Sequence, residues 1–179
     1  MAKIQTLAAA LAFAGAALGA PAAFADDISS APQTITLTDN AAFFGDVFTM
    51  NNSGNTFDDR FNFTAMAGDS LNAIVGSASS SAGVGLDITH FDLYTGTGTG
   101  TKVATGMMVQ SGANDVWTLS GPALAGGDYW LLVSGTMADD SGAAFGGALA
   151  LNPIPEPAGY AMLLGGLGVL GWMSRRRRQ

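Results

Sequence analysis

Residues 26–152 alternate apolar and polar side chains in short segments, and this alternation limits the fold more than any other feature of the sequence. Gly, Asn, Asp and Ser cluster between the segments, as tight turns require. No long 3.6-residue periodicity interrupts the pattern, so helices in this region are predicted to be minor. The predicted strands cover residues 34–38, 44–50, 60–65, 71–77, 86–94, 102–110, 116–119, 128–134 and 144–151.

These regularly spaced strands predict an all-β domain, a β-sandwich with a jelly-roll-like arrangement around one core. The composition agrees, because the chain has 25 glycines and only 12% charged residues. Segment 128–134 places apolar side chains on both of its faces, which predicts a central strand. Residues 26–152 are enough for one domain of this kind.

The first 25 residues have the layout of a signal peptide. Lys3 supplies a positive charge, and residues 7–18 form an apolar run that is too short to span a bilayer comfortably as a helix. Ala23 and Ala25 place small side chains at the two positions that a signal peptidase accommodates. We therefore predict cleavage by signal peptidase after Ala25; a buried Ala-rich helix is the less favoured alternative.

The C-terminal segment 153–179 contains a second apolar run at residues 158–173, directly after a Pro-Glu-Pro motif. Four arginines follow the run: Arg175, Arg176, Arg177 and Arg178. Arginines beside a hydrophobic helix resist translocation, so they act as a stop-transfer signal and the preceding residues face outward. The run is predicted to form a transmembrane helix. At about 1.5 Å per residue it is slightly short for a hydrocarbon core of about 30 Å, and snorkelling arginines compensate.

The order of these features resembles the PEP-CTERM sorting signal of Gram-negative bacteria over residues 153–179. The resemblance implies processing by an exosortase, a membrane-embedded cysteine protease that cuts near Pro155, Glu156 and Pro157. It implies a precursor anchored in the inner membrane with its body in the periplasm, and a mature protein at the cell surface or outside the cell. Such proteins are associated with exopolysaccharide and biofilm production, so exopolysaccharide is an expected partner.

The segment 26–152 is strongly acidic, with thirteen Asp and only two basic residues, Arg60 and Lys102. Its net charge of −11 excludes nucleic acid as an expected partner, because phosphate contacts need clusters of Lys or Arg. The acidic surface fits either solubility or divalent cations, and solubility is the simpler interpretation. The chain has no cysteine, which excludes disulfides, thiol catalysis and Cys-ligated metals.

Two pentapeptides, 44–48 and 57–61, match the pattern F-x-D-x-F. Together with the Leu-Ala-Gly-Gly-Asp-Tyr-Trp stretch at 124–130 and the Gly-rich last strand, they resemble the FxDxF family of PEP-CTERM proteins over most of the mature chain. The resemblance implies no reaction, substrate or catalytic residue. The copy at 57–61 is favoured as the family's own, because Phe63 extends its strand. The motif residues are Phe57, Asp59 and Phe61 in that copy, and Phe44, Asp46 and Phe48 in the other.

Alternation along a strand sends both phenylalanines and the Asp of each motif to the same face of the sheet. A carboxylate between two rings on a core-facing side needs a partner. It can accept backbone N–H groups from a neighbouring turn, pair with Arg60 or Lys102, or bind Ca²⁺. A hydrogen-bonded structural Asp is the favoured interpretation, and no metal site or cofactor is predicted.

The sequence contains no motif that predicts an enzyme. His90 is the only histidine, and no nucleophile elbow or metal-ligand spacing accompanies it. Two pairs of adjacent carboxylates occur, at 58–59 and 139–140. Adjacent carboxylates point to opposite faces in a strand and are mostly solvated in turns, so neither pair predicts glycoside hydrolysis.

The predicted function is therefore that of an exported structural protein of the envelope or biofilm matrix. The alternative is a surface module that binds carbohydrate or Ca²⁺. Aromatic side chains on a sandwich face could form a stacking platform for sugar rings, but aromatic residues at alternate strand positions belong more often to the core. The candidates are Tyr94, Trp117, Tyr129 and Trp130.

Overall fold

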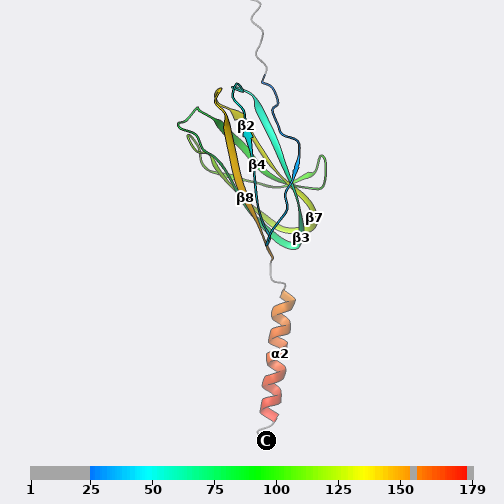
Figure 1. Ribbon diagram of the computed structural model, residues 1–179. Coiled ribbons are helices and arrows are strands. Elements are labelled where there is room, and N and C mark those ends of the chain that lie inside the picture. Colours follow the sequence, from blue (N-terminus) through cyan, green and yellow to red (C-terminus); the bar gives the residue numbers. More distant parts are fainter. Residues whose placement is uncertain (1–24, 154–156, 177–179) are drawn as a thin grey trace, which may run out of the picture.

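Two 22-residue strands, β3 (Thr56–Ser77) and β7 (Val116–Met137), form an antiparallel ribbon that runs through the whole body of the protein. The computed structural model describes residues 25–153 and 157–176, and Figure 1 shows the other elements around this ribbon. The remaining strands are β1 (Gln33–Thr34), β2 (Ala41–Phe48), β4 (Leu86–Thr95), β5 (Thr101–Thr105), β6 (Met107–Gln110) and β8 (Ala143–Pro153). A helix, α2 (Pro157–Arg176), follows them.

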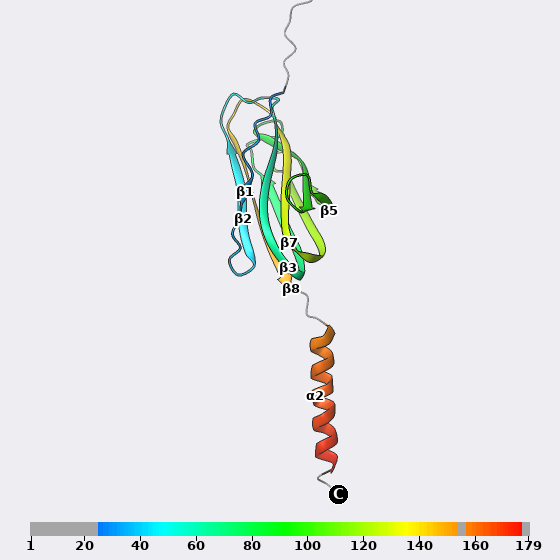
Figure 2. The ribbon, with the colours of Figure 1, turned by 90° about the vertical axis from the view of Figure 1, so that its right-hand side faces the viewer.

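The ribbon takes part in both layers of a β-sandwich (Figures 1 and 2). In the first layer, the first half of β3 pairs with the second half of β7, and β1, β4 and β5 extend the sheet. In the second layer, the second half of β3 pairs with β8 and with the first half of β7, and β2 and β6 extend the sheet. The predicted all-β sandwich is confirmed. It differs from a jelly roll in that β3 and β7 serve both layers.

Glycines allow the two long strands to change layer. The register of β3 shifts between Ala67 and Ser70, where Gly68 has a φ of 88°. On β7, Gly126 has a φ of 81°, and a Cβ at this position would meet the backbone nitrogen of Ala67 at 2.9 Å. Both the positive φ and the close approach require glycine.

This bend changes the predicted strand boundaries. Segments 60–65 and 71–77 are two parts of β3, and segments 116–119 and 128–134 are two parts of β7. The glycine-containing stretches between them were predicted as turns, because a bend in a continuous strand uses the same residue types as a turn. The central position predicted for 128–134 is confirmed, since β7 lies between β3 and β4.

Two other predicted strands also change. Segment 102–110 is divided into β5 and β6 at Gly106, where an added Cβ would meet the carbonyl oxygen of Phe91 at 2.7 Å. Segment 34–38 is mostly irregular, because β1 has only two residues and ends at Thr34.

Phenylalanine dominates the core between the two layers. Phe48 and Phe145 of the second layer pack on Phe57 of the first layer, with ring centroids 4.6 and 5.6 Å from that of Phe57. Phe91 of β4 is fully buried and stacks with Phe44 of β2 at 6.1 Å. No described residue of α2 belongs to this buried cluster, so the sandwich holds its whole described core by itself.

Helix α2 lies apart from the sandwich, beyond the end at which β8 stops (Figure 1). It covers the predicted apolar run 158–173 and begins at Pro157. Proline suits this position, because the N–H of the first helical residue would have no partner within the helix. Within the described residues, no helix combines the length and the mean hydropathy that crossing a bilayer requires. Glycines within the run lower its mean hydropathy. The length and hydropathy of α2 thus do not confirm the predicted transmembrane helix.

Several predicted site residues lie outside the described residues. They are Ala23, Pro155, Glu156, Arg177 and Arg178, together with the rest of the predicted signal peptide. Ala25, the predicted cleavage position, is the first described residue and is exposed. Arg175 and Arg176 form the end of α2.

Candidate functional site

The two F-x-D-x-F copies face each other across the core. Phe44 of β2 lies against Phe61 of β3, with ring centroids 4.9 Å apart, and Phe48 lies against Phe57 at 4.6 Å. The two motifs therefore meet in opposite directions, so that their central aspartates also come together. As predicted, Phe57, Asp59 and Phe61 point to the same face, and each is at most 1% exposed.

Asp59 has one bonded and one unbonded carboxylate oxygen. Its Oδ1 accepts the backbone N–H of Ser30 at 2.7 Å, which ties the N-terminal segment to the core. The Oδ1 of Asp46 accepts the backbone N–H of Val47 at 2.7 Å. Both Oδ2 atoms are buried without a hydrogen-bond partner among the described residues. The predicted backbone N–H partner is thus confirmed for Asp59.

The two predicted cationic partners of this Asp are engaged elsewhere. Lys102 binds Asp92 of β4 at 2.6 Å, and this hydrogen bond raises the pKa of Lys102. Arg60 points to the outer surface of the first layer, because it follows Asp59 in the strand.

The aspartate pair can hold a proton. The pKa of Asp59 is raised to about 7, mainly because burial disfavours its charged form. The hydrogen bond from Ser30 opposes this rise, and the negative charge of Asp46 adds to it. The two carboxyl groups are close enough to share a hydrogen bond when one of them is protonated. Near neutral pH, Asp59 therefore exchanges a proton inside the core.

A metal ion fits the pair less well than a proton does. Calcium takes six to eight oxygen ligands, whereas only two carboxylates meet here. Among the residues that the structure describes, no group of three or more His, Asp or Glu side chains could hold a metal ion.

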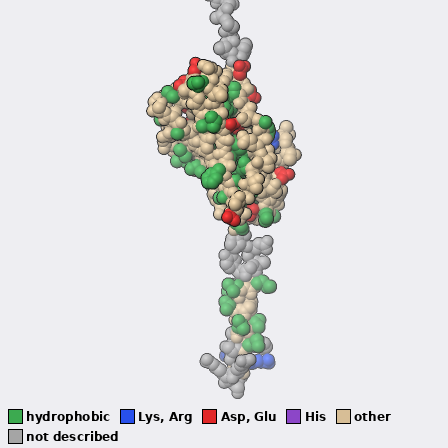
Figure 3. Space-filling view, in the orientation of Figure 1, with side chains coloured by type: hydrophobic (Ala, Val, Ile, Leu, Met, Phe, Trp, Pro, Cys, Tyr) green, Lys and Arg blue, Asp and Glu red, His purple; other side chains and the backbone are tan. Residues whose placement is uncertain are grey.

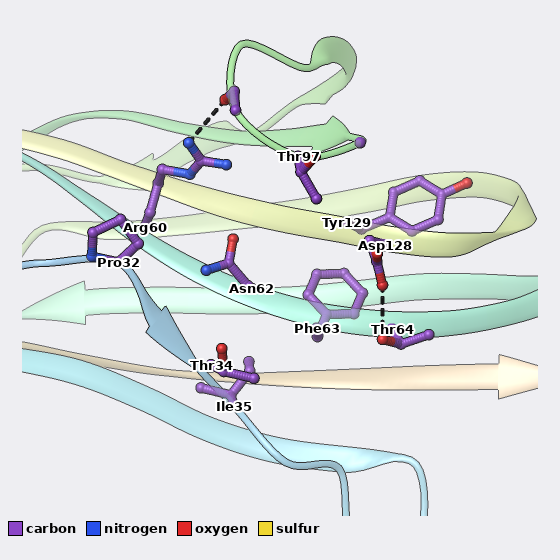
Figure 4. Close-up of a pocket in the computed structure, with 12 residues that line it drawn as sticks. Pro32, Thr34, Ile35, Arg60, Asn62, Phe63, Thr64, Thr97, Asp128 and Tyr129 are labelled. Atoms are coloured by element: carbon purple, nitrogen blue, oxygen red, sulfur yellow. Dashed lines mark hydrogen bonds between the residues drawn. The ribbon is translucent and has the colours of Figure 1, made fainter.

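The second candidate is a groove of about 500 Å³ on the outside of the first layer (Figure 4). It lies between the N-terminal segment, the outward side chains of β3 and the 96–98 loop. In Figure 4 the side chains of Arg60, Asn62 and Asp128 surround the hollow from different sides. Its wall combines polar and apolar side chains, and Thr64 donates a hydrogen bond to Asp128 at 3.0 Å. The lining residues are Pro32, Thr34, Ile35, Arg60, Asn62, Phe63, Thr64, Gly96, Thr97, Gly98, Asp128 and Tyr129.

Arg60 is held rigidly at the edge of this groove. Its guanidinium carbon lies 3.8 Å from the ring centroid of Trp130, and its Nη1 donates to the carbonyl of Gly98 at 2.8 Å. Tyr94 stacks on the same indole at 4.1 Å with an interplanar angle of 5°. Arg60 and Tyr94 therefore cover both faces of Trp130. The sequence signal for this arrangement is weak, because the three residues come from three different strands.

The four aromatic candidates do not form an open platform for sugars. Trp117 and Tyr129 are buried, and each makes an internal hydrogen bond: Trp117 donates to the carbonyl of Ile88, and Tyr129 accepts from the N–H of Ala125. Trp130 is covered as described above. The interpretation as core is thus confirmed for Trp117 and Tyr129, whereas Trp130 is buried outside the core cluster by its contacts with Arg60 and Tyr94.

The other polar candidates remain separate from one another. His90 is exposed, and its Nδ1 lies 3.2 Å from Thr89 Oγ1. Asp58 is exposed while Asp59 is buried, as expected for neighbours in a strand. In the turn before β8, Asp139 accepts the N–H groups of Gly85 and Ser141, and its hydrogen bonds lower its pKa. His90 and Asp58 thus lie on strands, and Asp139 stabilises a turn.

The described chain thus consists of a sandwich with its own core and a separate C-terminal helix with a basic end. Residues 153–178 match the family model of the PEP-CTERM protein-sorting motif. The chain therefore carries the sorting signal of exosortase substrates, as the sequence predicts. The match does not extend to the F-x-D-x-F segments, so the resemblance to that narrower family stays a prediction.

Solved structures resemble the body only distantly. PliG of Aeromonas hydrophila, a periplasmic inhibitor of g-type lysozyme, has a TM-score of 0.43 and 12% identity, covering 72% of this chain and 100% of PliG. The pre-peptidase C-terminal domain of a Bacillus anthracis collagenase has a TM-score of 0.34 and 13% identity, covering 75% of this chain and 100% of that domain. A search of curated proteins found no significant match. At these scores neither structure informs the function.

Proposed function

We propose that the chain is an exported precursor whose sandwich acts outside the inner membrane as a non-enzymatic structural protein of the envelope or biofilm matrix. The match of residues 153–178 to the PEP-CTERM protein-sorting motif carries this proposal. In this scheme signal peptidase removes residues 1–25. An exosortase then cuts near the Pro-Glu-Pro motif at 155–157, and the mature body reaches the cell surface or the medium.

The layout of the tail supports a cut at this point. β8 ends at Pro153 and α2 begins at Pro157, so cleavage between them removes no residue of a strand. Prolines in the connection favour extended backbone, which a protease can bind. The buried cluster lies entirely in the sandwich, so the body keeps its core after release.

Helix α2 is proposed to anchor the precursor in the inner membrane until the cut. Arg175 and Arg176 end the helix, and with the two following arginines they hold this end on the cytoplasmic side. Glycines 165, 168 and 171 recur at a spacing of three and leave one side of the helix bare. That side would permit close approach of a helix of the processing enzyme.

Fractionation of cells that contain or lack the exosortase tests the proposal. In cells with the enzyme, the mature body is expected at the cell surface or in the medium, without residues 157–179. In cells without it, the uncut precursor is expected in the inner membrane. Glu156→Ala should cause the same retention, whereas Asn152→Ala, an exposed change just before the motif, should not. Recovery of the full-length chain from the cytosol would refute export.

A second candidate function is the binding of a carbohydrate in the groove beside Arg60. The observation in its favour is the set of polar side chains around a hollow of about 500 Å³, where Arg60, Asn62 and Asp128 can bond to hydroxyl or carboxylate groups. Titration with the extracellular polysaccharide of the producing cells tests it. Binding should weaken in Asn62→Ala and persist in Asn72→Ala, an exposed change in the second layer. Equal affinity of the two variants would exclude this groove.

A further inference from the structure

The outer face of the second layer exposes large apolar side chains. The strand register places one residue from each of five strands in a row, which we name the apolar ridge: Phe43, Ala148, Ile74, Thr118 and Met107. Phe43 is 87% exposed, Met107 is 74% exposed and Ile74 is 47% exposed. Exposed apolar side chains that line up across a whole sheet mark a surface that another molecule covers.

A hollow runs beside this ridge. The next row on the same face, two residues further along each strand, consists of small residues and is named the glycine groove: Gly45, Gly146, Gly76 and Val116. It opens into a hollow of about 540 Å³ that Phe43 and Ile74 of the ridge help to line. Val47, which is 76% exposed, flanks the groove on its other side.

The fold does not explain the glycine at the centre of the groove. At Gly45 an added Cβ would meet the carbonyl oxygen of Phe145 at 2.5 Å, so this position needs glycine within the monomer. At Gly76 it would lie 3.0 Å from the carbonyl oxygen of Asp115, a contact tighter than most Cβ atoms make. At Gly146 an added Cβ would meet nothing within 4 Å. Glycine weakens the interior of a strand, and it is retained where another backbone or ligand approaches closely.

Charge narrows the choice of partner. None of the ridge and groove residues is charged, although the segment 26–152 carries a net charge of −11. In Figure 3, green hydrophobic side chains reach the surface where β8 runs in Figure 1, and red acidic side chains lie mainly toward the ends of the body and its right-hand side. Two copies of this body repel each other through their acidic surfaces, and this uncharged face is where they can meet.

We propose that this face binds the same face of a second copy of the chain, with the ridge of each copy in the glycine groove of the other. Ridge and groove lie side by side, about 7 Å apart along the strands, given about 3.4 Å per strand residue. A twofold axis parallel to the rows and midway between them exchanges ridge and groove, so both contacts form at once. Gly146 of one copy then faces Ala148 of the other, and the sheets pack at the usual distance of about 10 Å.

This symmetry sets the strands of the two copies antiparallel. β8 of each copy leads to its tail, so the two tails project from opposite ends of the pair. Two copies anchored side by side in one membrane point the same way and cannot pair in this manner. Pairing in the cell therefore requires that the body is first released from the membrane, which rests on the proposed function.

Sedimentation velocity of the purified full chain in detergent tests the interface without reference to export. The wild type is expected to dimerise with rising concentration. Gly146→Val should weaken dimerisation at least about tenfold, because it fills the groove, which corresponds to about 1.4 kcal/mol. Its melting temperature should stay the same or rise, because valine favours strands and meets no neighbour. Ile74→Ser should also weaken dimerisation, and Thr101→Val, an exposed change on β5, should not.

The result decides whether or not this face is a dimer interface. Dimers that Gly146→Val and Ile74→Ser disrupt, in variants that melt like the wild type, establish the interface. A wild type that stays monomeric up to its highest soluble concentration overturns the proposal. The face would then bind a molecule other than a second copy. Dimers that both variants leave intact also overturn it, because the contact then lies elsewhere. None of these outcomes depends on whether an exosortase cuts the chain.

Discussion

Asp46 and Asp59, the central residues of two F-x-D-x-F motifs 13 positions apart in the chain, place their carboxyl groups together at the border of the core, where Asp59 is buried and Asp46 is half-buried. Each has a buried Oδ2 without a hydrogen-bond partner in the described part of the protein. Two carboxylates cannot both stay charged at such a place without a large loss of stability. The pair therefore links the stability of the sandwich to pH.

We expect the free energy of unfolding to fall as the pH rises. The folded-state pKa of Asp59 is about 7, above its ordinary value of 3.8, so the protonated form favours folding. This contribution is complete below about pH 4 and is lost as the pH rises through 7. A shift of this size corresponds to about 4 kcal/mol at most. Urea unfolding between pH 4 and pH 8 measures it.

Asp59→Asn should abolish this dependence and raise stability at pH 8. The amide keeps an oxygen for the N–H of Ser30 and offers an N–H to Asp46 without a charge. Asp58→Asn is the matched control, because Asp58 is exposed and lies next to Asp59 in the strand. An unchanged pH profile in Asp59→Asn would show that another group causes the dependence.

Replacing a core phenylalanine should lower the free energy of unfolding far more than replacing a phenylalanine on the exposed face. Phe57→Ala should reduce the free energy of unfolding by about 3–5 kcal/mol, because Phe57 is 1% exposed and packs against Phe48 and Phe145. Phe43→Ala should change it by less than about 0.5 kcal/mol, because Phe43 is 87% exposed. Denaturant melts at low protein concentration measure both. Similar losses for the two variants would contradict the assignment of their faces.

Removal of the Arg60 guanidinium should expose Trp130. Arg60→Ala is expected to shift the tryptophan fluorescence to longer wavelength and to cost about 1 kcal/mol, because the cation–π contact at 3.8 Å is lost. The same change in a Trp130→Phe background should give no shift, which separates this signal from those of the other tryptophans. A shift that persists in that background would place the change elsewhere in the protein.

Chelation should leave the melting temperature unchanged. The described residues offer no set of three carboxylate or imidazole ligands, and the Asp46–Asp59 pair alone is too small for Ca²⁺. Differential scanning calorimetry with EDTA and with added Ca²⁺ tests this. A fall of several degrees on chelation would mean that the pair holds a cation instead of a proton.

The local pattern of the sequence was enough to predict most strands and the inward face of each motif. Alternation places Phe57, Asp59 and Phe61 on one side of a strand whatever lies opposite, so their common burial follows from the strand alone. Glycine was ambiguous, because it marks turns and bends alike. The stretch around Gly68 was predicted as a turn between two strands, whereas its backbone lets one strand continue into the second layer.

The sorting signal is also local, since order, charge and apolar length can be read without a fold. The sorting tail was recognised from Pro-Glu-Pro, the apolar run and the arginines, and its match to the PEP-CTERM motif agrees. Only the tertiary structure decided which strands face each other. That pairing brings Asp46 to Asp59, covers Trp130 with Arg60, and lines up Phe43 with Ile74 on an open face. These relationships depend on contacts between residues distant in the chain, which burial of the whole core selects and which no single segment encodes.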